Sequence, residues 1–257
     1  EPSYVIIDES TDLATIDFVA KPLGWNIPES WNGAASGTAE HLNDIAFAFG
    51  QYFAVGNKGT LLVSSDGVNW NTTSAGTAVD LQAVAKGTLL GIETVVLVGD
   101  DGWIFTSIDG SSWSGSQIAP GEDFNDVVFG AVHMGFAAVT NTGNIYSRGV
   151  NPGWSKSNTE TYDGFAGIVY KNSLPQNYFA VTTEGDVYAP SSGDSNGVSN
   201  WGLQSSAPIG TSTVTGVVTI DDFIAVFPYN HTEAKLSRDG VSWYEWDYGI
   251  SASAIYD

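Results

Sequence analysis

Six tryptophans recur along the chain at a nearly constant interval, and this spacing limits the folds that the sequence can adopt. They are Trp25, Trp70, Trp113, Trp154, Trp201 and Trp243, and successive members lie 41 to 47 residues apart. From Trp243 through the C-terminus and on from residue 1 to Trp25 is a further 39 residues, so the period nearly closes on itself. The 257 residues therefore read as one unit repeated from end to end.

Each repeat contains three short apolar runs separated by turns, and the last turn ends in tryptophan. Residues 43–70 read NDIAFAFGQYFAVGNKGTLLVSSDGVNW, and residues 125–154 follow the same order. The second run, for example Tyr52–Val55, precedes a turn such as GNKG (56–59), whose glycine permits the positive φ of a tight hairpin. Short strands in repeats of about 40–45 residues are typical of a β-propeller with one four-stranded blade per repeat. The alternative is an open β-sandwich with chance spacing.

The two ends of the chain complete one repeat between them. Tyr4–Ile7 and Asp12–Ile16 match a second and a third strand, whereas Ser251–Tyr256 matches only a first strand. We therefore expect one all-β domain over residues 1–257, a six-bladed β-propeller of four-stranded antiparallel blades, with one blade completed jointly by the N- and C-terminal segments. Such closure removes the exposed edge of the sheet. The expected blades span about 42–80, 81–123, 124–163, 164–212, 213–250, and 251–257 together with 1–41.

The charge balance limits the possible partners. The net charge is −21, from 29 acidic and only 8 basic residues, and the chain has no cysteine. Nucleic acids and anionic membranes both require clustered basic residues, so neither is expected as a partner. No apolar run approaches the ~18–20 residues of a membrane span, so membrane insertion is not expected. An acidic surface without thiols fits an extracellular or virion-surface location, and Glu1 in place of Met suggests a processed or excerpted chain.

Three repeats carry a sharper motif. In the first of them the motif is Ser64-Ser65-Asp66-Gly67-Val68-Asn69-Trp70. The aspartate accepts hydrogen bonds from turn amides, the glycine permits the bend, and the tryptophan packs between blades. The motif resembles the Asp-box (BNR) repeats of sialidase-like propellers and of bacterial and phage surface proteins. The resemblance implies that the turn lies between the third and fourth strands, opposite the usual ligand face, and that its residues are structural. These residues are Ser64, Asp66, Gly67, Trp70, Ser107, Asp109, Gly110, Trp113, Ser237, Asp239, Gly240 and Trp243.

The resemblance raises an enzymatic hypothesis that the arginine count opposes. Sialidases clamp the substrate carboxylate with three arginines, because the guanidinium group binds a carboxylate in a bidentate manner. This chain has two, Arg148 and Arg238, and both lie beside or inside the motif turns. A sialidase mechanism of the known kind cannot be built from them, and we assign no catalytic residue.

A different glycoside hydrolase would need two carboxylates about 5–10 Å apart. Acidic residues in or beside the hairpins offer candidates: Asp8, Glu9, Asp100, Asp101, Glu184 and Asp186. The alternative is a solvated acidic rim, since exposed turns are normally polar. The three histidines are too scattered for a metal site, and Asp100-Asp101 would bind calcium only weakly, so neither a metal nor a cofactor is expected.

Two departures from the repeat indicate where a ligand would bind. Residues 227–232 replace a glycine turn and carry Tyr229 and His231, and the linker 31–41 carries Trp31. Trp103 follows the GDDG turn, although it would alternatively pack within its own blade. Aromatic rings beside carboxylates suit a sugar. The candidate ligand-binding residues are Asp100, Asp101, Trp103, Glu184, Tyr229, His231 and Trp31.

Three functions remain open at this point. The first is a non-catalytic recognition propeller on a virion or cell exterior, which binds a glycan or another surface receptor through the face opposite the motif turns. The second is a divergent glycoside hydrolase or lyase that uses the rim carboxylates. The third is a structural module that contacts a neighbouring protein in a larger particle. Propellers serve all three, so the fold alone does not choose.

Overall fold

The computed structural model describes residues 35–130, 135–149, 153–157, 159, 161, 163–172, 177–190, 200–207, 209, 212–220, 223–229, 231 and 233–247. Within these ranges the chain forms twenty strands and two short 3₁₀ turns, η1 (Asn57–Gly59) and η2 (Asp100–Gly102). No helix in this part of the chain is long and apolar enough to cross a bilayer. The expected terminal blade, including Trp25, lies outside the described residues except for residues 35–41.

The strands form five antiparallel sheets of four, each built from consecutive strands. The first holds β1 (Leu42–Ala48), β2 (Gln51–Gly56), β3 (Leu61–Ser64) and β4 (Asn71–Thr73). The second holds β5 (Leu81–Leu89), β6 (Ile92–Gly99), β7 (Trp103–Ser107) and β8 (Ser114–Gln117). The third holds β9 (Phe124–Gly130), β10 (Gly135–Thr140), β11 (Ile145–Arg148) and β12 (Ser155–Ser157). The fourth holds β13 (Phe165–Lys171), β14 (Asn177–Thr182), β15 (Asp186–Pro190) and β16 (Trp201–Ser206). The fifth holds β17 (Val214–Ile220), β18 (Phe223–Pro228), β19 (Glu233–Ser237) and β20 (Trp243–Asp247).

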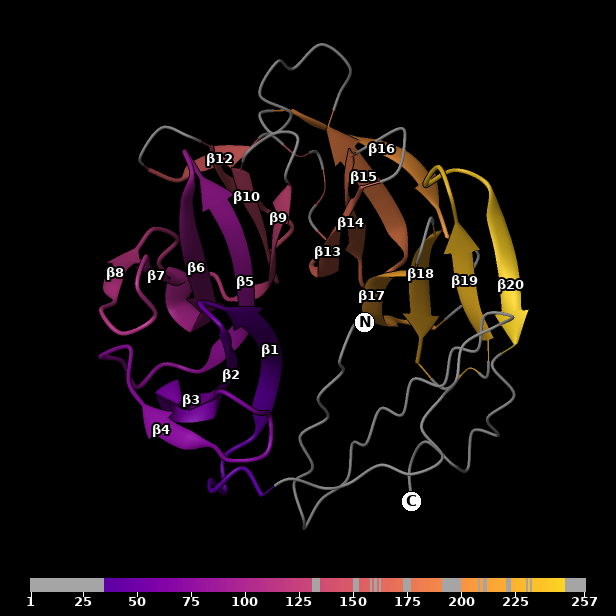
Figure 1. Ribbon diagram of the computed structural model, residues 1–257. Coiled ribbons are helices and arrows are strands. Elements are labelled where there is room, and N and C mark those ends of the chain that lie inside the picture. The colour runs from indigo at the N-terminus through magenta and orange to yellow at the C-terminus, as the bar shows by residue number, and fades with distance from the viewer. Residues whose placement is uncertain are drawn as a thin grey trace.

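The sheets stand around a central axis as the blades of a propeller, so the all-β architecture with four-stranded antiparallel blades is as expected. In Figure 1 the first strand of each sheet lies nearest the axis and the fourth lies at the periphery. The first strands of successive sheets contact one another, β1 with β5, β5 with β9, β9 with β13 and β13 with β17. We call these sheets blades 1 to 5 in chain order.

The hydrophobic core lies between neighbouring blades. Phe53 of blade 1 and Leu97 of blade 2 belong to one buried cluster, and Val96, the neighbour of Leu97 in β6, belongs to another with Phe136 of blade 3. The second strand of a blade is therefore covered on both faces, which explains why its sequence is a continuous apolar run rather than an alternating one. All six residues of β10 are buried. Burial of each large apolar side chain stabilises the fold by about 1.5–3 kcal/mol.

One backbone hydrogen bond recurs in all five blades. The residue that follows the second strand donates its N–H to the carbonyl of the residue directly before the first strand. The pairs are Asn57 to His41 (2.9 Å), Asp100 to Asp80 (3.0 Å), Asn141 to Asp123 (2.9 Å), Thr183 to Gly164 (2.8 Å) and Tyr229 to Thr213 (2.7 Å). This bond fixes the chain where it enters each blade. In blade 2 the approach is so close that a Cβ atom at Gly99 would collide with the Asp80 carbonyl.

Candidate functional site

The antiparallel register gives each blade two ends with different chemistry. Leu42 pairs with Gly56, and Leu61 with Thr73, so the start of the first strand and the turn between the second and third strands share one end. We call this the rim end. The opposite end carries the turn between the third and fourth strands. The three motif turns (64–70, 107–113 and 237–243), which we call the Asp-turns, lie there.

The Asp-turns are held by hydrogen bonds within seven residues. In the first, Asp66 Oδ1 accepts from the N–H groups of Val68 (2.9 Å) and Asn69 (2.8 Å), and Ser64 Oγ accepts from the Gly67 N–H (2.8 Å). These bonds favour the ionised form and lower the pKa of Asp66. The same pattern occurs around Asp109, whose pKa is also lowered, and around Asp239, whose pKa falls to about 2. A carboxylate engaged in this way stabilises its own turn.

The tryptophans that end the Asp-turns differ in their partners. Trp70 donates its indole N–H to the Gly67 carbonyl (3.2 Å), and Trp243 donates to Ser205 Oγ (3.0 Å). Trp113 packs edge-on against Phe53 of blade 1, with ring centroids 6.2 Å apart, and its buried indole N–H has no hydrogen-bond partner. The expected packing between blades is therefore seen directly at Trp113.

Two of the carboxylates proposed for ligand binding at the rim end bond to their own blade and its exit loop. Asp100 Oδ1 accepts from Gln82 Nε2 (2.8 Å), and partial burial raises the pKa of Asp100. Asp101 Oδ2 accepts from Gln117 Nε2 (2.7 Å), and its Oδ1 accepts from the Gly121 N–H (2.8 Å). These contacts organise the loop that leaves blade 2.

The other candidates at the rim end are spread over separate blades. Trp103 stacks on Phe105 in its own blade, with ring centroids 5.7 Å apart and planes 13° apart, so it adopts the packing arrangement that the sequence left open as an alternative. Glu184 is exposed in the β14–β15 turn of blade 4. Tyr229, which is 47% exposed, and His231 follow β18 in blade 5. Trp31 lies outside the described residues.

Two aspartates link the innermost strands of neighbouring blades near the axis. Asp44 Oδ2 accepts from the Val84 N–H of blade 2 (2.8 Å), and Asp126 Oδ2 accepts from the Ile168 N–H of blade 4 (2.8 Å). Burial raises the pKa of Asp44 to about 6, and burial together with the nearby charge of Asp44 raises the pKa of Asp126 to about 7. Each residue keeps some accessible surface, but the protein atoms around the carboxyl group displace most of its water, which determines the shift.

The asparagines that precede these aspartates reinforce the same links. Asn43 Nδ2 donates to the Leu81 carbonyl of blade 2 (2.8 Å), and Asn125 Nδ2 donates to the Phe165 carbonyl of blade 4 (2.7 Å). These side chains therefore hold one blade to the next.

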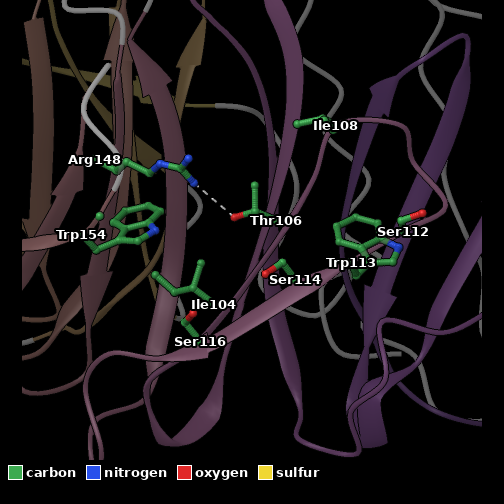
Figure 2. Close-up of a pocket in the computed structure, with 10 residues that line it drawn as sticks. Ile104, Thr106, Ile108, Ser112, Trp113, Ser114, Ser116, Arg148 and Trp154 are labelled. Atoms are coloured by element: carbon green, nitrogen blue, oxygen red, sulfur yellow. Dashed lines mark hydrogen bonds between the residues drawn. The ribbon is translucent and has the colours of Figure 1, made fainter.

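A cavity of about 470 Å³ lies between the outer part of blade 2 and the Asp-turn end of blade 3. Figure 2 shows the Arg148 guanidinium reaching from the end of β11 toward Thr106 of β7, with the Trp154 ring beside it. Arg148 Nη1 donates to Thr106 Oγ1 (3.4 Å). The other lining residues are Ile104, Ile108, Ser112, Trp113, Ser114, Ser116 and Gly153. A concave site with aromatic rings and a few convergent polar groups is typical of a small-ligand site.

Among the described residues no group of three or more histidine, aspartate or glutamate side chains is arranged to hold a metal ion. Weak calcium binding at Asp100 and Asp101 remains a prediction. The cavity has a different chemistry, because its lining contains one charged side chain, Arg148, and no carboxylate. Sequence reasoning set Arg148 aside because it lies beside a motif turn. The signal that could have found the cavity is the degenerate turn Ser147-Arg148-Gly149, which lacks the aspartate of the Asp-turns.

The comparisons with known proteins establish the fold class. No protein-family model and no curated protein matches the chain. Solved β-propeller structures do match. Virginiamycin B lyase from Staphylococcus aureus superimposes with a TM-score of 0.70 at 6% identity, over 85% of this chain and 74% of that one. YCF48 bound to D1 peptide gives a TM-score of 0.59 at 16% identity, over 81% of this chain and 67% of that one.

A third neighbour is the WD40 β-propeller domain of Doa1, with a TM-score of 0.58 at 13% identity, over 81% of this chain and 70% of that one. The chain therefore has a β-propeller fold. At these identities the likeness concerns the fold alone, and the neighbours have diverse functions.

Proposed function

We propose that this chain is a non-catalytic recognition propeller that binds a glycan on a virion or cell exterior. The observation that carries the proposal is the cavity between blades 2 and 3, where Trp154, Arg148 and serine hydroxyls converge. A sugar is bound when its apolar face stacks on an aromatic ring while its hydroxyl groups meet polar side chains. The acidic, cysteine-free composition supports an exterior location. The cavity replaces the rim end as the proposed site, because Asp100, Asp101 and Trp103 form contacts within the protein.

The test is a glycan array probed with the whole chain and with two matched variants. Trp154→Ala removes a cavity ring, and Trp70→Ala removes the tryptophan at the same repeat position in blade 1, away from the cavity. We expect the wild type and Trp70→Ala to bind the same glycans and Trp154→Ala to lose them, with circular dichroism confirming that both variants fold. Absence of any glycan signal for the wild type would reject the proposal. So would equal binding by both variants.

The hydrolase alternative has less support. Two carboxylates that exchange protons with a substrate must be available to it. Asp101 accepts hydrogen bonds through both of its oxygens, and Asp100 accepts one from Gln82. Turnover of a polysaccharide that disappears in Asp100→Asn or Glu184→Gln would restore this candidate. A structural role in a larger particle would instead be indicated by a stable protein contact without any glycan binding.

We further propose that the propeller has six blades and belongs with the Asp-box repeat proteins. The support is the 39-residue interval that closes the tryptophan period and the hydrogen-bond pattern shared by the three Asp-turns. A closed ring has no free strand edge. Removal of residues 248–257 should therefore lower the midpoint of thermal unfolding and promote aggregation. A truncated chain that stays monomeric with an unchanged midpoint would contradict closure.

A further inference from the structure

The charge distribution around the cavity is the reverse of that of the whole protein. The chain carries 29 acidic residues and 8 lysines and arginines, yet the cavity lining has one charged side chain and it is an arginine. Among the described residues Arg148 forms no ion pair, and its side chain forms one hydrogen bond, to Thr106 Oγ1 at 3.4 Å. Its Nε is buried and has no acceptor. A guanidinium group has five N–H donors, so most of its hydrogen-bonding capacity is unused.

The second arginine of the chain shows what this repeat position looks like without a cavity. Arg238 follows Ser237 in blade 5 as Arg148 follows Ser147 in blade 3. Its guanidinium lies over the Phe223 ring, 4.6 Å from the ring centroid, and the next residue is Asp239. Arg148 is followed by Gly149 and therefore has no carboxylate beside it in its own turn. Among the described residues no carboxylate pairs with Arg148, so its guanidinium is available to an anion from outside.

The neighbouring side chains set the size and polarity of that anion. The Trp154 ring lies close to the guanidinium in Figure 2 and packs on the core of blades 2 and 3 with part of its surface accessible. Ser114 and Ser116 alternate along β8, so their exposed hydroxyls lie on one face of the strand. A cation, an aromatic face and two hydroxyls would contact a carboxylate, an apolar ring face and hydroxyl groups of one ligand.

We propose that the cavity binds a sugar residue that carries a carboxylate, such as a uronic acid at the end of a glycan. The carboxylate pairs with the Arg148 guanidinium, the C–H face of the ring lies on Trp154, and the hydroxyl groups meet Ser114 and Ser116. This inference rests on the proposed function and adds the class of sugar.

The test compares three probes by NMR titration of the whole chain, following the indole N–H signals of Trp154 and, as a reference, Trp70. The probes are methyl β-D-glucuronide, which has a sugar ring and a carboxylate, methyl β-D-glucoside, which has only the sugar ring, and N-acetyl-alanyl-alanine, which has only the carboxylate. We expect the glucuronide to bind at least ~10-fold more tightly than the glucoside, since a charge-assisted hydrogen bond contributes more than one factor of ten. We expect the dipeptide, which has a carboxylate but no sugar ring, to bind weakly.

The matched variants are Arg148→Gln and Arg238→Gln, which remove the same charge from the same repeat position in different blades. We expect Arg148→Gln to lose the ~10-fold preference for glucuronide and Arg238→Gln to keep it. If Arg148→Gln fails to fold, Arg148→Lys retains the charge but not the bidentate geometry, and the preference should fall. Equal binding of both sugars by the wild type would overturn the inference, and so would a preference that survives Arg148→Gln.

The outcomes separate this inference from the proposed function. Binding of neutral glycans that depends on Trp154 but not on Arg148 would leave the recognition function standing and reject the acidic sugar. Binding of the dipeptide in preference to the glucuronide would assign the cavity to a peptide carboxylate and reject the sugar. No binding of any probe, together with a blank glycan array, would reject both.

Discussion

The aspartates near the axis predict that the protein loses stability as the pH rises from 5 to 8. Burial raises the pKa of Asp126 from 3.8 to about 7 in the folded protein. A carboxyl group with a raised folded pKa binds its proton more tightly in the folded state than in the unfolded state. Folding is therefore favoured by this group while it is protonated, and that contribution disappears as the pH rises through about 7.

The magnitude follows from the part of the shift that the experiment crosses. Two pH units separate pH 5 from the folded pKa, and each corresponds to about 1.4 kcal/mol, so Asp126 contributes about 3 kcal/mol to the loss. Asp44, with a pKa of about 6, adds about 1 kcal/mol by the same reasoning. Because the charge of Asp44 acts on Asp126, the two steps belong to the pair.

The assay is urea unfolding followed by tryptophan fluorescence at pH 5, 6, 7 and 8. Asp126→Asn removes the titrating group, and Asp163→Asn removes one charge from an exposed turn as a control. The free energy of unfolding should fall by about 3 kcal/mol less in Asp126→Asn than in the control. The slope is compared rather than the absolute value, because asparagine can accept from only one of the N–H groups of Val127 and Ile168. A wild-type slope in Asp126→Asn would refute the reasoning.

Three further predictions concern stability. Ser107→Ala should lower the free energy of unfolding by about 1–2 kcal/mol in urea titrations, since it deletes a buried hydroxyl that accepts and donates within its Asp-turn; an unchanged midpoint would contradict this. Gly102→Ala should lower the free energy of unfolding by more than about 2 kcal/mol, because φ is +69° and a Cβ would collide with the Ala119 carbonyl. Gly121→Ala, at a φ of +82° with no atom within 4 Å, should lower it by about 1 kcal/mol. Equal losses of the two variants in thermal melts would contradict this. Tyr178→Phe should cost about 1 kcal/mol by calorimetry through loss of its hydrogen bond to the Gly135 carbonyl (2.7 Å), and a more stable variant would show that this bond contributes nothing.

The parts of the fold that depend on neighbours in sequence were predictable. The second strands could be recognised because burial on both faces requires an unbroken apolar run, as in Val95–Val98. The Asp-turn could be recognised because Asp66 accepts from amides two and three residues away, so a short run of consecutive residues determines its geometry. In both cases the signal lies in consecutive residues of one repeat, although the burial of the second strand comes from the neighbouring blades.

The features that depend on two repeats were not predictable in the same way. Asp44 receives a hydrogen bond from Val84, 40 residues away, and nothing in its own repeat marks it as a buried acid. The cavity needs Thr106 from one blade and Arg148 from the next, and the distance between them is set by the packing of the blades. The turn at Arg148 departed from the motif, and a departure does not by itself indicate what the changed residues contact.

The degenerate turn of blade 3 has a consequence for how such a chain changes over generations. Each of blades 1 to 5 has the same backbone hydrogen bond at the start of its first strand, and this bond does not depend on side chains. The aspartate of one Asp-turn can therefore be substituted while the other repeats still stabilise the fold. Because the repeats are redundant in this way, one of them can acquire a new binding site. In a tandem array such a site is expected at the repeat whose sequence departs from the others.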